Sequence, residues 1–436
     1  MSHIAVIGLW HQGIVGAACL AEAGHSVRAA GADESVLRGL RDGKAPIYEP
    51  GLDDLLTQEL KSGRLTFPDS LETAVQGADV VLLMHDTPVD EKDQSDLTPL
   101  YSDMDRMIPS LDDGVVIYAT AQVPVGTCDE IGARIRARRP DLKFGMAYSP
   151  ENLRLGQAIE RFKQPPLPVI GADEDWVFER VEALWSIHAV KWERVNLRTG
   201  EMVKHALNTF LATTITLGNE LGNLCDEVGA DGHRLTEVLR LEPRVGPKAM
   251  LFPGLGFAGG TLARDVQTLR GLGDGAQLET PLLDGLWASN EQQNSLVERK
   301  LNRLFGGSLK GRVVTILGLT YKPDTSTLRR SAAVAVAEAL HSGGATVRAT
   351  DPKADRTELG THAWLAFSED PYEAARDADA VVLMTPWKQY HDIDPARMAS
   401  VMKGRGVLDT ANLWKAELWI EQGFTYLDIG RGRRSG

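Results

Sequence analysis

The sequence predicts an α/β protein with two doubly wound parallel-sheet domains joined by a central helical domain with long helices. Three observations support this fold class. Two short apolar strands each lead into a glycine-containing turn. One is His3–Ile7, at the start of the chain, and the other is Arg312–Gly318, at the start of its C-terminal region. Ala78–Met84 is a continuous apolar run, which is typical of a strand buried on both faces of a parallel sheet. Between these regions, residues 201–228 carry apolar side chains at helical spacing.

The first elements form a β–turn–α–β unit. The strand His3–Ile7 is followed by the turn Gly8–Gly13, a helix over Ile14–Ala23 and a second strand over Ser26–Ala30. This order is typical of a Rossmann-like dinucleotide-binding domain, in which the helix N-terminus attracts the pyrophosphate. Gly114–Ala119 and three further segments extend the sheet: Ala78–Met84, Val169–Gly171 and Ala189–Val195.

Gly8, Trp10, Gly13 and Asp33 are the expected cofactor contacts in this unit. The dinucleotide fingerprint G-x-G-x-x-G reads G-x-W-x-x-G here, because Trp10 replaces the glycine that normally lets the phosphates approach. Gly31 stands where an acidic residue normally binds the ribose hydroxyls, and the nearest carboxylate is Asp33. Because Gly31 removes the carboxylate that normally disfavours a 2′-phosphate, the choice between NAD and NADP stays open at this point.

The middle of the chain is predicted to be helical. Residues 201–228 form one long amphipathic helix, and Thr280–Phe305 form a second, with a proline in its first turn. Lys204 and Asn208 are four residues apart and therefore share one helix face. A lysine among apolar neighbours is often a surface residue. The alternative, a site residue, is favoured by the neighbouring amide and by the glycine-rich loop that follows.

That loop, Phe252–Asp265, reads FPGLGFAGGTLARD. Its glycines let backbone approach backbone or a ligand where a Cβ would clash. A flexible surface turn is the other interpretation, but Phe252, Leu255 and Phe257 are unusual in a free loop. We therefore expect this loop to hold a small ligand.

The C-terminal region repeats the α/β pattern. A strand over Arg312–Gly318 is followed by a helix over Ala332–His341, and the further strands are Thr346–Thr350, Ala380–Met384 and Gly406–Asp409. We expect three domains: a dinucleotide-binding domain over 1–198, a helical dimerisation domain over 199–306, and a nucleotide-sugar-binding, Rossmann-like domain over 307–436.

Composition excludes several classes of function. Hydrophobic residues make up 43% of the chain and charged residues 25%, as in soluble globular proteins. The net charge of -13 argues against a nucleic-acid or anionic-membrane surface. Neither a secretion segment nor an apolar run of roughly 20 residues is found. Cys19, Cys128 and Cys225 lack metal-type spacing, so we expect no metal site, no disulfide framework and a cytoplasmic location.

Ordered motifs along nearly the whole chain resemble those of the UDP-glucose/GDP-mannose dehydrogenase family. They are Ala18–His25, Pro46–Leu52, Val123–Thr127, Ser149–Arg154, Lys204-x-x-x-Asn208-x-Phe210-Leu211-Ala212, Arg244-x-Gly246 and Gly318–Pro323. The resemblance implies oxidation of a sugar C6 alcohol to a carboxylate with two NAD, a central helix that makes a homodimer, and a loop cysteine that captures the aldehyde as a thiohemiacetal.

The resemblance also implies roles for individual residues. Glu151 handles protons, Lys204 and Asn208 stabilise the developing alkoxide, and Asp265 assists the base chemistry. Further contacts are expected at the cofactor and at the nucleotide sugar, with Arg244 reaching across a dimer. The cofactor contacts are Gly8, Trp10, Gly13, Asp33, Thr87, Gln122 and Arg329, and the substrate contacts are Leu153, Arg244, Phe252, Gly254, Gly259 and Lys322.

Several positions depart from the family pattern. No cysteine lies in the loop, and Thr261 is a poor substitute because a hydroxyl without an adjacent base is a weak nucleophile. Gln122 stands where a threonine is expected, and Leu155 where a glutamate often sits. Ala411 replaces the arginine that usually contacts the sugar nucleotide.

Three functions remain open. The first is an oxidation of a nucleotide sugar or related sugar that transfers one hydride without the cysteine, ending at a carbonyl or reversing as an epimerisation. The second is the full oxidation of the C6 alcohol to a carboxylate through an aldehyde hydrate. The third is a non-catalytic binding or scaffold protein on the same fold. The retained lysine, asparagine and carboxylates favour activity.

Overall fold

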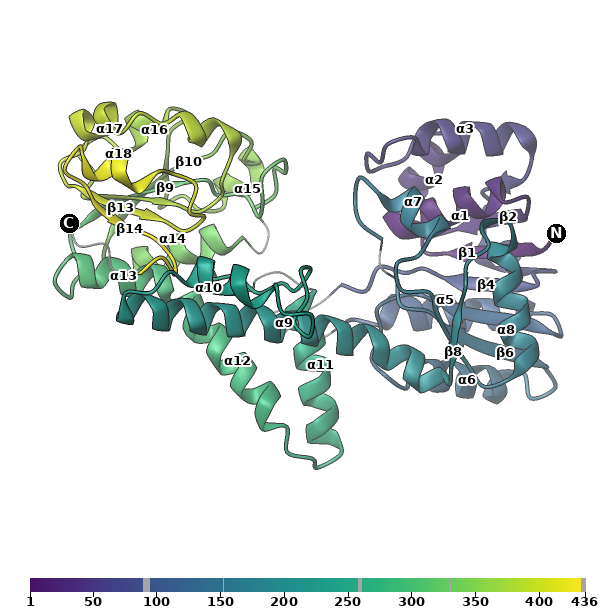
Figure 1. The fold of residues 1–436 in the computed structure, drawn as a ribbon. Helices are drawn as coiled ribbons and strands as arrows, with labels where there is room; N and C mark the ends of the chain where they lie inside the picture. Colours follow the sequence, from purple (N-terminus) through teal and green to yellow (C-terminus); the bar gives the residue numbers. More distant parts are fainter. Residues whose placement is uncertain (89–94, 152, 258–260, 329–330, 433–436) are drawn as a thin grey trace. The chain divides into compact units, whose positions relative to one another are not determined.

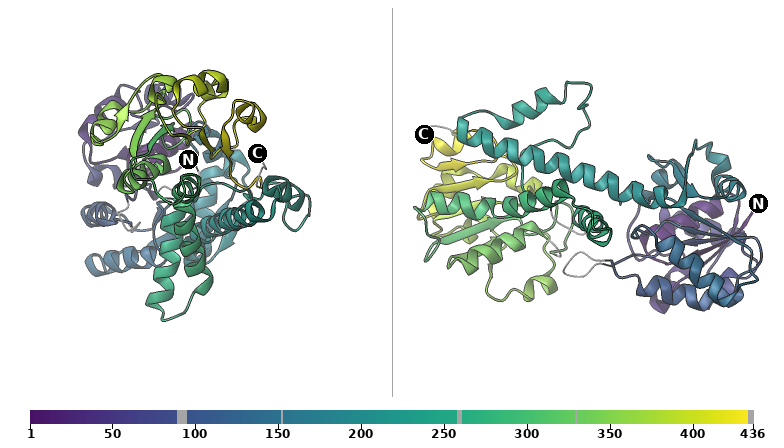
Figure 2. Two further views of the ribbon diagram at one scale, coloured as in Figure 1. Left: turned by 90° about the vertical axis from the view of Figure 1, so that its left-hand side faces the viewer. Right: turned by 90° about the horizontal axis from the view of Figure 1, so that it is seen from below.

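The computed structural model describes residues 1–88, 95–151, 153–257, 261–328 and 331–432. The chain divides into two compact units, residues 1–207 and 208–436 (Figure 1). The boundary falls inside the long helix α9, Leu197–Val228, which is seen along its length in the right-hand view of Figure 2. The three-domain division expected from the sequence stays a prediction.

Unit 1 contains a mixed sheet with the order β3-β2-β1-β4-β5-β6-β7-β8. Its strands are β1 His3–Ile7, β2 Ser26–Ala30, β3 Leu65–Thr66, β4 Val80–Leu83, β5 Val115–Ala119, β6 Phe144–Tyr148, β7 Val169–Ala172 and β8 Glu193–Val195. The helices before α9 are α1 His11–Glu22, α2 Glu34–Arg41, α3 Leu52–Ser62, α4 Leu71–Val75, α5 Thr98–Met107, η1 Ile108–Ser110, α6 Thr127–Arg138, α7 Ala158–Lys163, α8 Asp175–Glu182 and η2 Ala183–His188.

Helices cover both faces of this sheet, as a doubly wound fold requires. Side chains of α1, α3, α7 and α8 form the core on one face. Those of α4, α5 and α6 form the core on the other. The central strands are therefore buried on both sides, which explains the continuous apolar sequence of β4 and β5.

Two strands of unit 1, β7 and β8, depart from the parallel arrangement that the sequence predicts, because they run parallel to each other but opposite to β6. β7 pairs antiparallel with β6, so that Ala147 lies opposite Ala172. β7 also packs closely on the start of α9, because a Cβ on Gly171 would lie 2.9 Å from the Cα of Gly200. Such mixed edges are common in large α/β sheets, and an apolar run of four residues carries no sign of its direction.

Unit 2 contains a parallel sheet with the order β11-β10-β9-β12-β13-β14. Its strands are β9 Val313–Leu317, β10 Thr346–Thr350, β11 Ala366–Phe367, β12 Ala380–Leu383, β13 Gly406–Asp409 and β14 Thr425–Leu427. The helices that follow α9 are α10 Gly232–Leu239, α11 Leu262–Gly275, α12 Pro281–Asn294, α13 Leu296–Leu304, α14 Ala332–Ser342, α15 Arg356–Gly360, α16 Pro371–Ala374, η3 Lys388–Asp392, α17 Pro395–Val401 and α18 Ala416–Ile420.

Two helical predictions need correction. The single helix expected over Thr280–Phe305 is wrong, because α12 ends and α13 begins at Ser295, whose ψ of 6° is not helical. The Ser295 hydroxyl donates to the Gln292 carbonyl, a local bond that competes with the helix ladder. α9 begins before Glu201, because the Asn196 side chain accepts the Thr199 N–H and caps the first turn.

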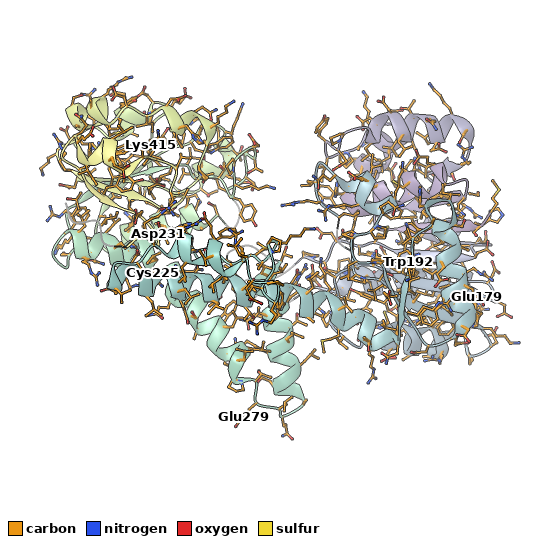
Figure 3. The ribbon with its side chains drawn as sticks, viewed as in Figure 1. Glu179, Trp192, Cys225, Asp231, Glu279 and Lys415 are labelled. Atoms are coloured by element: carbon orange, nitrogen blue, oxygen red, sulfur yellow. The ribbon has the colours of Figure 1, made fainter. Side chains whose placement is uncertain are left out.

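The helices α11 and α12 form an antiparallel hairpin in unit 2, and Glu279 lies at the turn between them (Figure 3). Ala212 of α9 packs with Val266 of α11 and Leu286 of α12 in a small core. The hairpin therefore places the start of α11, which is the end of the glycine-rich loop, beside α9.

Candidate active site

Gly8 and Gly13 form the turn between β1 and α1, and both positions require glycine. Gly8 has a φ of +100°, and a Cβ there would lie 2.7 Å from the backbone nitrogen of His85, which follows β4. A Cβ on Gly13 would lie 1.8 Å from the Gly8 carbonyl oxygen. The turn therefore lies against the end of the neighbouring strand, at the point where the strand order reverses. In open α/β sheets this is where ligands bind.

The N-terminus of α1 is suited to an anion. Its N-cap residue, Trp10, makes no side-chain capping bond, and the first turn carries no acidic residue. Side-chain capping therefore does not occupy the amide N–H groups there, and the helix dipole favours negative charge at this end. The Trp10 side chain is 45% exposed, so it is not part of the hydrophobic core. These features fit the pyrophosphate of a dinucleotide.

Asp33 lies just beyond β2 and caps α2. Its Oδ1 accepts hydrogen bonds from the Ser35 hydroxyl at 2.6 Å, the Ser35 N–H at 2.8 Å and the Val36 N–H at 3.2 Å. The Ser35 hydroxyl bond, followed by the two backbone bonds, holds the pKa of Asp33 below its ordinary value. The carboxylate is thus charged and fixed near the end of β2, where a ribose is expected.

A buried carboxylate that the sequence analysis did not single out connects this turn to the loop after β6. Glu49 accepts the His11 Nε2–H at 3.0 Å, and the N–H groups of Gly156 and Ala158 each at 2.9 Å. Burial raises the pKa of Glu49, but these hydrogen bonds outweigh burial and hold it below its ordinary value. The motif Tyr-Glu-Pro-Gly was the available signal, because a glutamate between apolar and turn residues needs partners when buried.

Within unit 1, the structure brings Glu151 and Lys204 together. The Lys204 Nζ donates to the Glu151 backbone carbonyl at 2.7 Å. The Glu151 carboxylate accepts the Leu153 N–H, so this predicted substrate contact lies beside the predicted base. Burial raises the pKa of Glu151, opposed by the Lys204 charge, the Leu153 bond and the charge of His11. A carboxyl with a raised pKa in such a setting is suited to proton transfer.

The first turns of α9 also fix the loop between β5 and α6. The fully buried Glu201 accepts the Gly126 N–H at 2.7 Å and the Cys128 N–H at 2.8 Å. The His205 Nε2–H donates to the Val123 carbonyl at 2.9 Å. The same loop contains the predicted contact Gln122, whose carbonyl accepts the Thr87 hydroxyl at 2.9 Å. Along α9, Lys204 therefore lies between Glu201 and His205, the two side chains that hold the β5–α6 loop.

Within unit 2, Asn208 and Asp265 are paired. The Asn208 Nδ2–H donates to Oδ2 of Asp265, and both side chains are buried. Asp265 lies in the first turn of α11, where the helix dipole favours a negative charge. The polar pair is thus fixed on both sides, by α9 and by α11.

The predicted substrate contacts of unit 2 separate into two groups. Lys322 lines a cavity of about 370 Å³ between the residues after β9 and the segment 255–257. Gly254 is held by α9 and α12, since its N–H donates to Asn219 at 2.8 Å and its carbonyl accepts from Gln293 at 2.6 Å. The guanidinium of Arg240 stacks 3.9 Å from the Phe252 ring.

Arg244 stands apart from that cavity's lining. Its side chain is 89% exposed and pairs with Glu242 at 2.8 Å. Two other predicted contacts, Gly259 and Arg329, lie outside the described residues.

All three cysteines are buried and lie outside the glycine-rich loop. Cys19 is on α1, Cys128 on α6 and Cys225 on α9. Burial raises the pKa of Cys19 to about 12, and it also raises the pKa of Cys128 and of Cys225. A thiol that stays protonated and inaccessible is a poor nucleophile.

Two kinds of feature are absent from the described residues. These residues contain no group of three or more His, Cys, Asp or Glu side chains placed to hold a metal ion. Across the same ranges, no helix combines the length and apolar composition needed to cross a bilayer.

Unit 1 has the features of a Rossmann-type dinucleotide-binding protein. These are its sheet order, its glycine turn and the N-terminus of α1, which is suited to an anion. Comparison with known families makes this specific. Residues 2–188 match the NAD binding domain of the UDP-glucose/GDP-mannose dehydrogenase family, residues 198–292 its central domain, and residues 315–416 its UDP binding domain. The chain belongs to the UDP-glucose/GDP-mannose dehydrogenase family, a family of NAD-dependent nucleotide-sugar dehydrogenases.

Individual relatives match over almost their full length. The chain is 35% identical to a UDP-glucose 6-dehydrogenase of Rhizobium meliloti (strain 1021), over 98% of this chain and 99% of the relative. It is 33% identical to a UDP-glucose 6-dehydrogenase of Pseudomonas aeruginosa, over 99% and 98%. Among solved structures, a UDP-glucose dehydrogenase from Pyrobaculum islandicum superposes with a TM-score of 0.87 at 29% identity, covering 99% of this chain and 98% of that one.

Proposed function

We propose that the protein is an NAD-dependent dehydrogenase that oxidises an alcohol of a nucleotide sugar without a covalent thiohemiacetal step. One observation carries the proposal. Within unit 1, the Lys204 ammonium contacts the backbone carbonyl of Glu151, at the same edge of the sheet as the glycine turn. The pKa of the Glu151 carboxyl is raised. A non-catalytic descendant has no need to keep a cation and a proton acceptor in this arrangement.

Each retained residue has a chemical task in this reaction. When bound, NAD+ supplies the hydride acceptor. Glu151 in its carboxylate form takes the proton from the substrate hydroxyl. Lys204 and Asn208, four residues apart on α9, stabilise the negative charge that develops on the oxygen. Asp265 holds the Asn208 amide in one orientation through their hydrogen bond.

The absence of a loop cysteine supports a route without a sulfur adduct. Residues 252–265 contain no cysteine. Thr261 is the remaining hydroxyl in that loop, and it lies at the N-terminus of α11 with no base assigned to it. Carbonyl formation at the alcohol needs no covalent intermediate, whereas a second oxidation requires the aldehyde to be hydrated first.

A UDP-linked sugar is the first substrate to test. The Lys322 cavity lies in the region that matches the family's UDP binding domain, and the relatives named above are UDP-glucose 6-dehydrogenases. The replacement of an arginine by Ala411 leaves the identity of the sugar to experiment, and Gly31 does the same for the choice between NAD and NADP.

A second candidate is the full oxidation of the C6 alcohol to a carboxylate through an aldehyde hydrate. The names of the relatives favour it, because they match over nearly the whole chain. In this route, water takes the place of the thiolate as the nucleophile that attacks the aldehyde.

One stoichiometric experiment separates these functions. The protein is incubated with NAD+ or NADP+ and UDP-glucose, followed by a panel of nucleotide sugars, and reduced cofactor is counted per sugar consumed. One equivalent supports the carbonyl-forming reaction, and two equivalents support oxidation through the hydrate. No turnover together with no NAD+ binding by calorimetry would overturn the proposal that this is an enzyme.

We also propose that the protein is a homodimer that pairs through α9. Phe210, Leu217 and Leu224 recur every seven residues on this helix and are 63%, 49% and 62% exposed in the single chain. Three large apolar side chains in one stripe are unfavourable in water, and a second copy of the same stripe buries them.

A further inference from the structure

A small pocket of unit 1 lies beside Glu151. It has a volume of about 50 Å³ and lies between the ends of β4 and β5, the loop after β6, and the α7–η2 region. Trp185 forms part of its wall, and its ring centroid lies 5.2 Å from that of Phe162, in a tilted arrangement, and 5.2 Å from that of Trp192, in an edge-on arrangement. Trp192, labelled in Figure 3, lies on the segment between η2 and β8. Aromatic walls make the pocket rigid.

Two buried polar atoms at this pocket have no hydrogen-bond partner among the described residues. They are Oγ1 of Thr120, a residue only 7% exposed, and Nε1 of Trp192. Other polar groups in the lining are paired: the Ser149 hydroxyl donates to Val169 at 2.6 Å, and the Trp185 indole donates to Phe162 at 2.8 Å. A buried hydroxyl without a partner carries its full desolvation cost, so it calls for a ligand that can bond to it.

The charged residues of the lining are Glu151 and Arg161. The pocket thus adjoins a proposed catalytic residue whose backbone carbonyl accepts the Lys204 ammonium. Burial raises the pKa of the Glu151 carboxyl, which agrees with a mostly apolar surrounding. A pocket of this size has room for about three water molecules.

We propose that this pocket is a water site that supplies Glu151 with the water needed to hydrate an aldehyde. This inference rests on the second proposed function, oxidation through a hydrate. Glu151 first releases to solvent the proton that it took from the alcohol. The water oxygen then bonds to the aldehyde carbon while one water proton passes to the Glu151 carboxylate. The carbonyl oxygen takes a proton from the Lys204 ammonium, and the product is a gem-diol, the form from which the second hydride is removed.

Two measurements test the two parts of the inference. A crystal structure of the wild-type protein at high resolution is expected to show ordered water bonded to the Thr120 hydroxyl and to the Glu151 carboxylate. The variant Thr120→Val, which keeps the side-chain shape, is expected to lose that water. A pocket without water in the wild type overturns the inference, whatever the enzyme's activity.

The second measurement is the ratio of reduced cofactor to sugar consumed, with UDP-glucose as substrate and hydroxylamine present to trap released aldehyde. Thr120→Val is expected to lower the ratio from two towards one and to release trapped aldehyde, with an unchanged first oxidation. Trp192→Phe is expected to shift the ratio in the same direction. Thr315→Val is the matched control, because the Thr315 hydroxyl is already paired with the Ala374 carbonyl at 2.8 Å.

The outcomes distinguish this inference from the function on which it rests. A wild-type ratio of one overturns the hydration role together with oxidation through the hydrate. A wild-type ratio of two that Thr120→Val leaves unchanged overturns the role of the pocket alone.

Discussion

The contact between Lys204 and Glu151 decides between two interpretations of a lysine on an amphipathic helix. A surface lysine extends its ammonium into solvent, whereas this one donates to the Glu151 carbonyl at 2.7 Å. Glu201 and His205, on either side of it along α9, are buried and hold the β5–α6 loop. Lys204 therefore projects from a turn of helix that is fixed by its neighbours, as a preorganised donor requires.

We predict that Lys204→Ala lowers kcat/KM by a factor on the order of 10² to 10³, the usual effect of removing one donor to a developing oxyanion. Circular dichroism and the thermal unfolding temperature should stay close to those of the wild type. The control is Lys61→Ala, an exposed lysine on α3. Turnover of Lys204→Ala at the rate of this control would remove Lys204 from the site.

The raised pKa of Glu151 predicts a pH dependence of activity. The carboxylate is the active form, so kcat/KM should rise with pH through a pKa above the ordinary glutamate value of 4.5 and then level off. Glu151→Gln should show no such limb because it does not turn over. The exposed Glu160→Gln on α7 should keep the wild-type profile. A wild-type limb at or below the ordinary value would contradict the assignment.

The same group affects stability in the opposite direction. Because folding raises the pKa of Glu151, its contribution to the free energy of unfolding is complete below the unfolded-state pKa. That contribution is lost as the pH rises through the folded-state value.

At the scale of elements, two glycines of α9 allow the loop that precedes α11 to pack closely against this helix. A Cβ on Gly218 would lie 2.7 Å from both the backbone N and the carbonyl O of Phe252. A Cβ on Gly222 would lie 2.5 Å from the Cβ of Pro253. Glycine normally weakens a helix interior, so these two positions trade helix stability for close packing of the loop on the helix.

We predict that Gly218→Ala destabilises unit 2 by about 1–3 kcal/mol, because the loop backbone must move away from α9. Gly271→Ala on α11 is the matched control, since a Cβ there meets nothing within 4 Å and alanine favours a helix by up to about 1 kcal/mol. Urea unfolding of both variants measures the two shifts, which should have opposite signs. A stabilised Gly218→Ala would show that the loop does not pack there.

Elements with strong periodicity were predictable, and those set by tertiary contacts were not. The β1–α1–β2 unit and the long α9 follow from apolar spacing and are confirmed. The break at Ser295 coincides with one side-chain bond, and the direction of β7 cannot be inferred from an apolar run of four residues. Glu49 and Glu201 escaped notice because their partners are backbone N–H groups far away in the sequence.

At the scale of the whole molecule, the exposed stripe on α9 predicts the oligomeric state. Leu217→Glu with Leu224→Glu should convert a dimer to a monomer, raising the dimer dissociation constant by on the order of 30-fold or more, as loss of an interface hot spot does. Light scattering after size exclusion measures the mass. Leu418→Glu is the control, because Leu418 is 50% exposed but lies on α18, away from the stripe. A wild-type monomer would contradict the proposal.

The three buried thiols have a practical consequence for the intact enzyme. Cys19, Cys128 and Cys225 are at most 5% exposed, and a route without sulfur gives none of them a part in turnover. Activity is therefore expected to survive iodoacetamide or mild hydrogen peroxide, treatments that silence enzymes with a working thiolate. Rapid inactivation by iodoacetamide would mean that one of these sulfur atoms takes part after all. Tolerance would make this chain suited to sugar oxidation under oxidative stress.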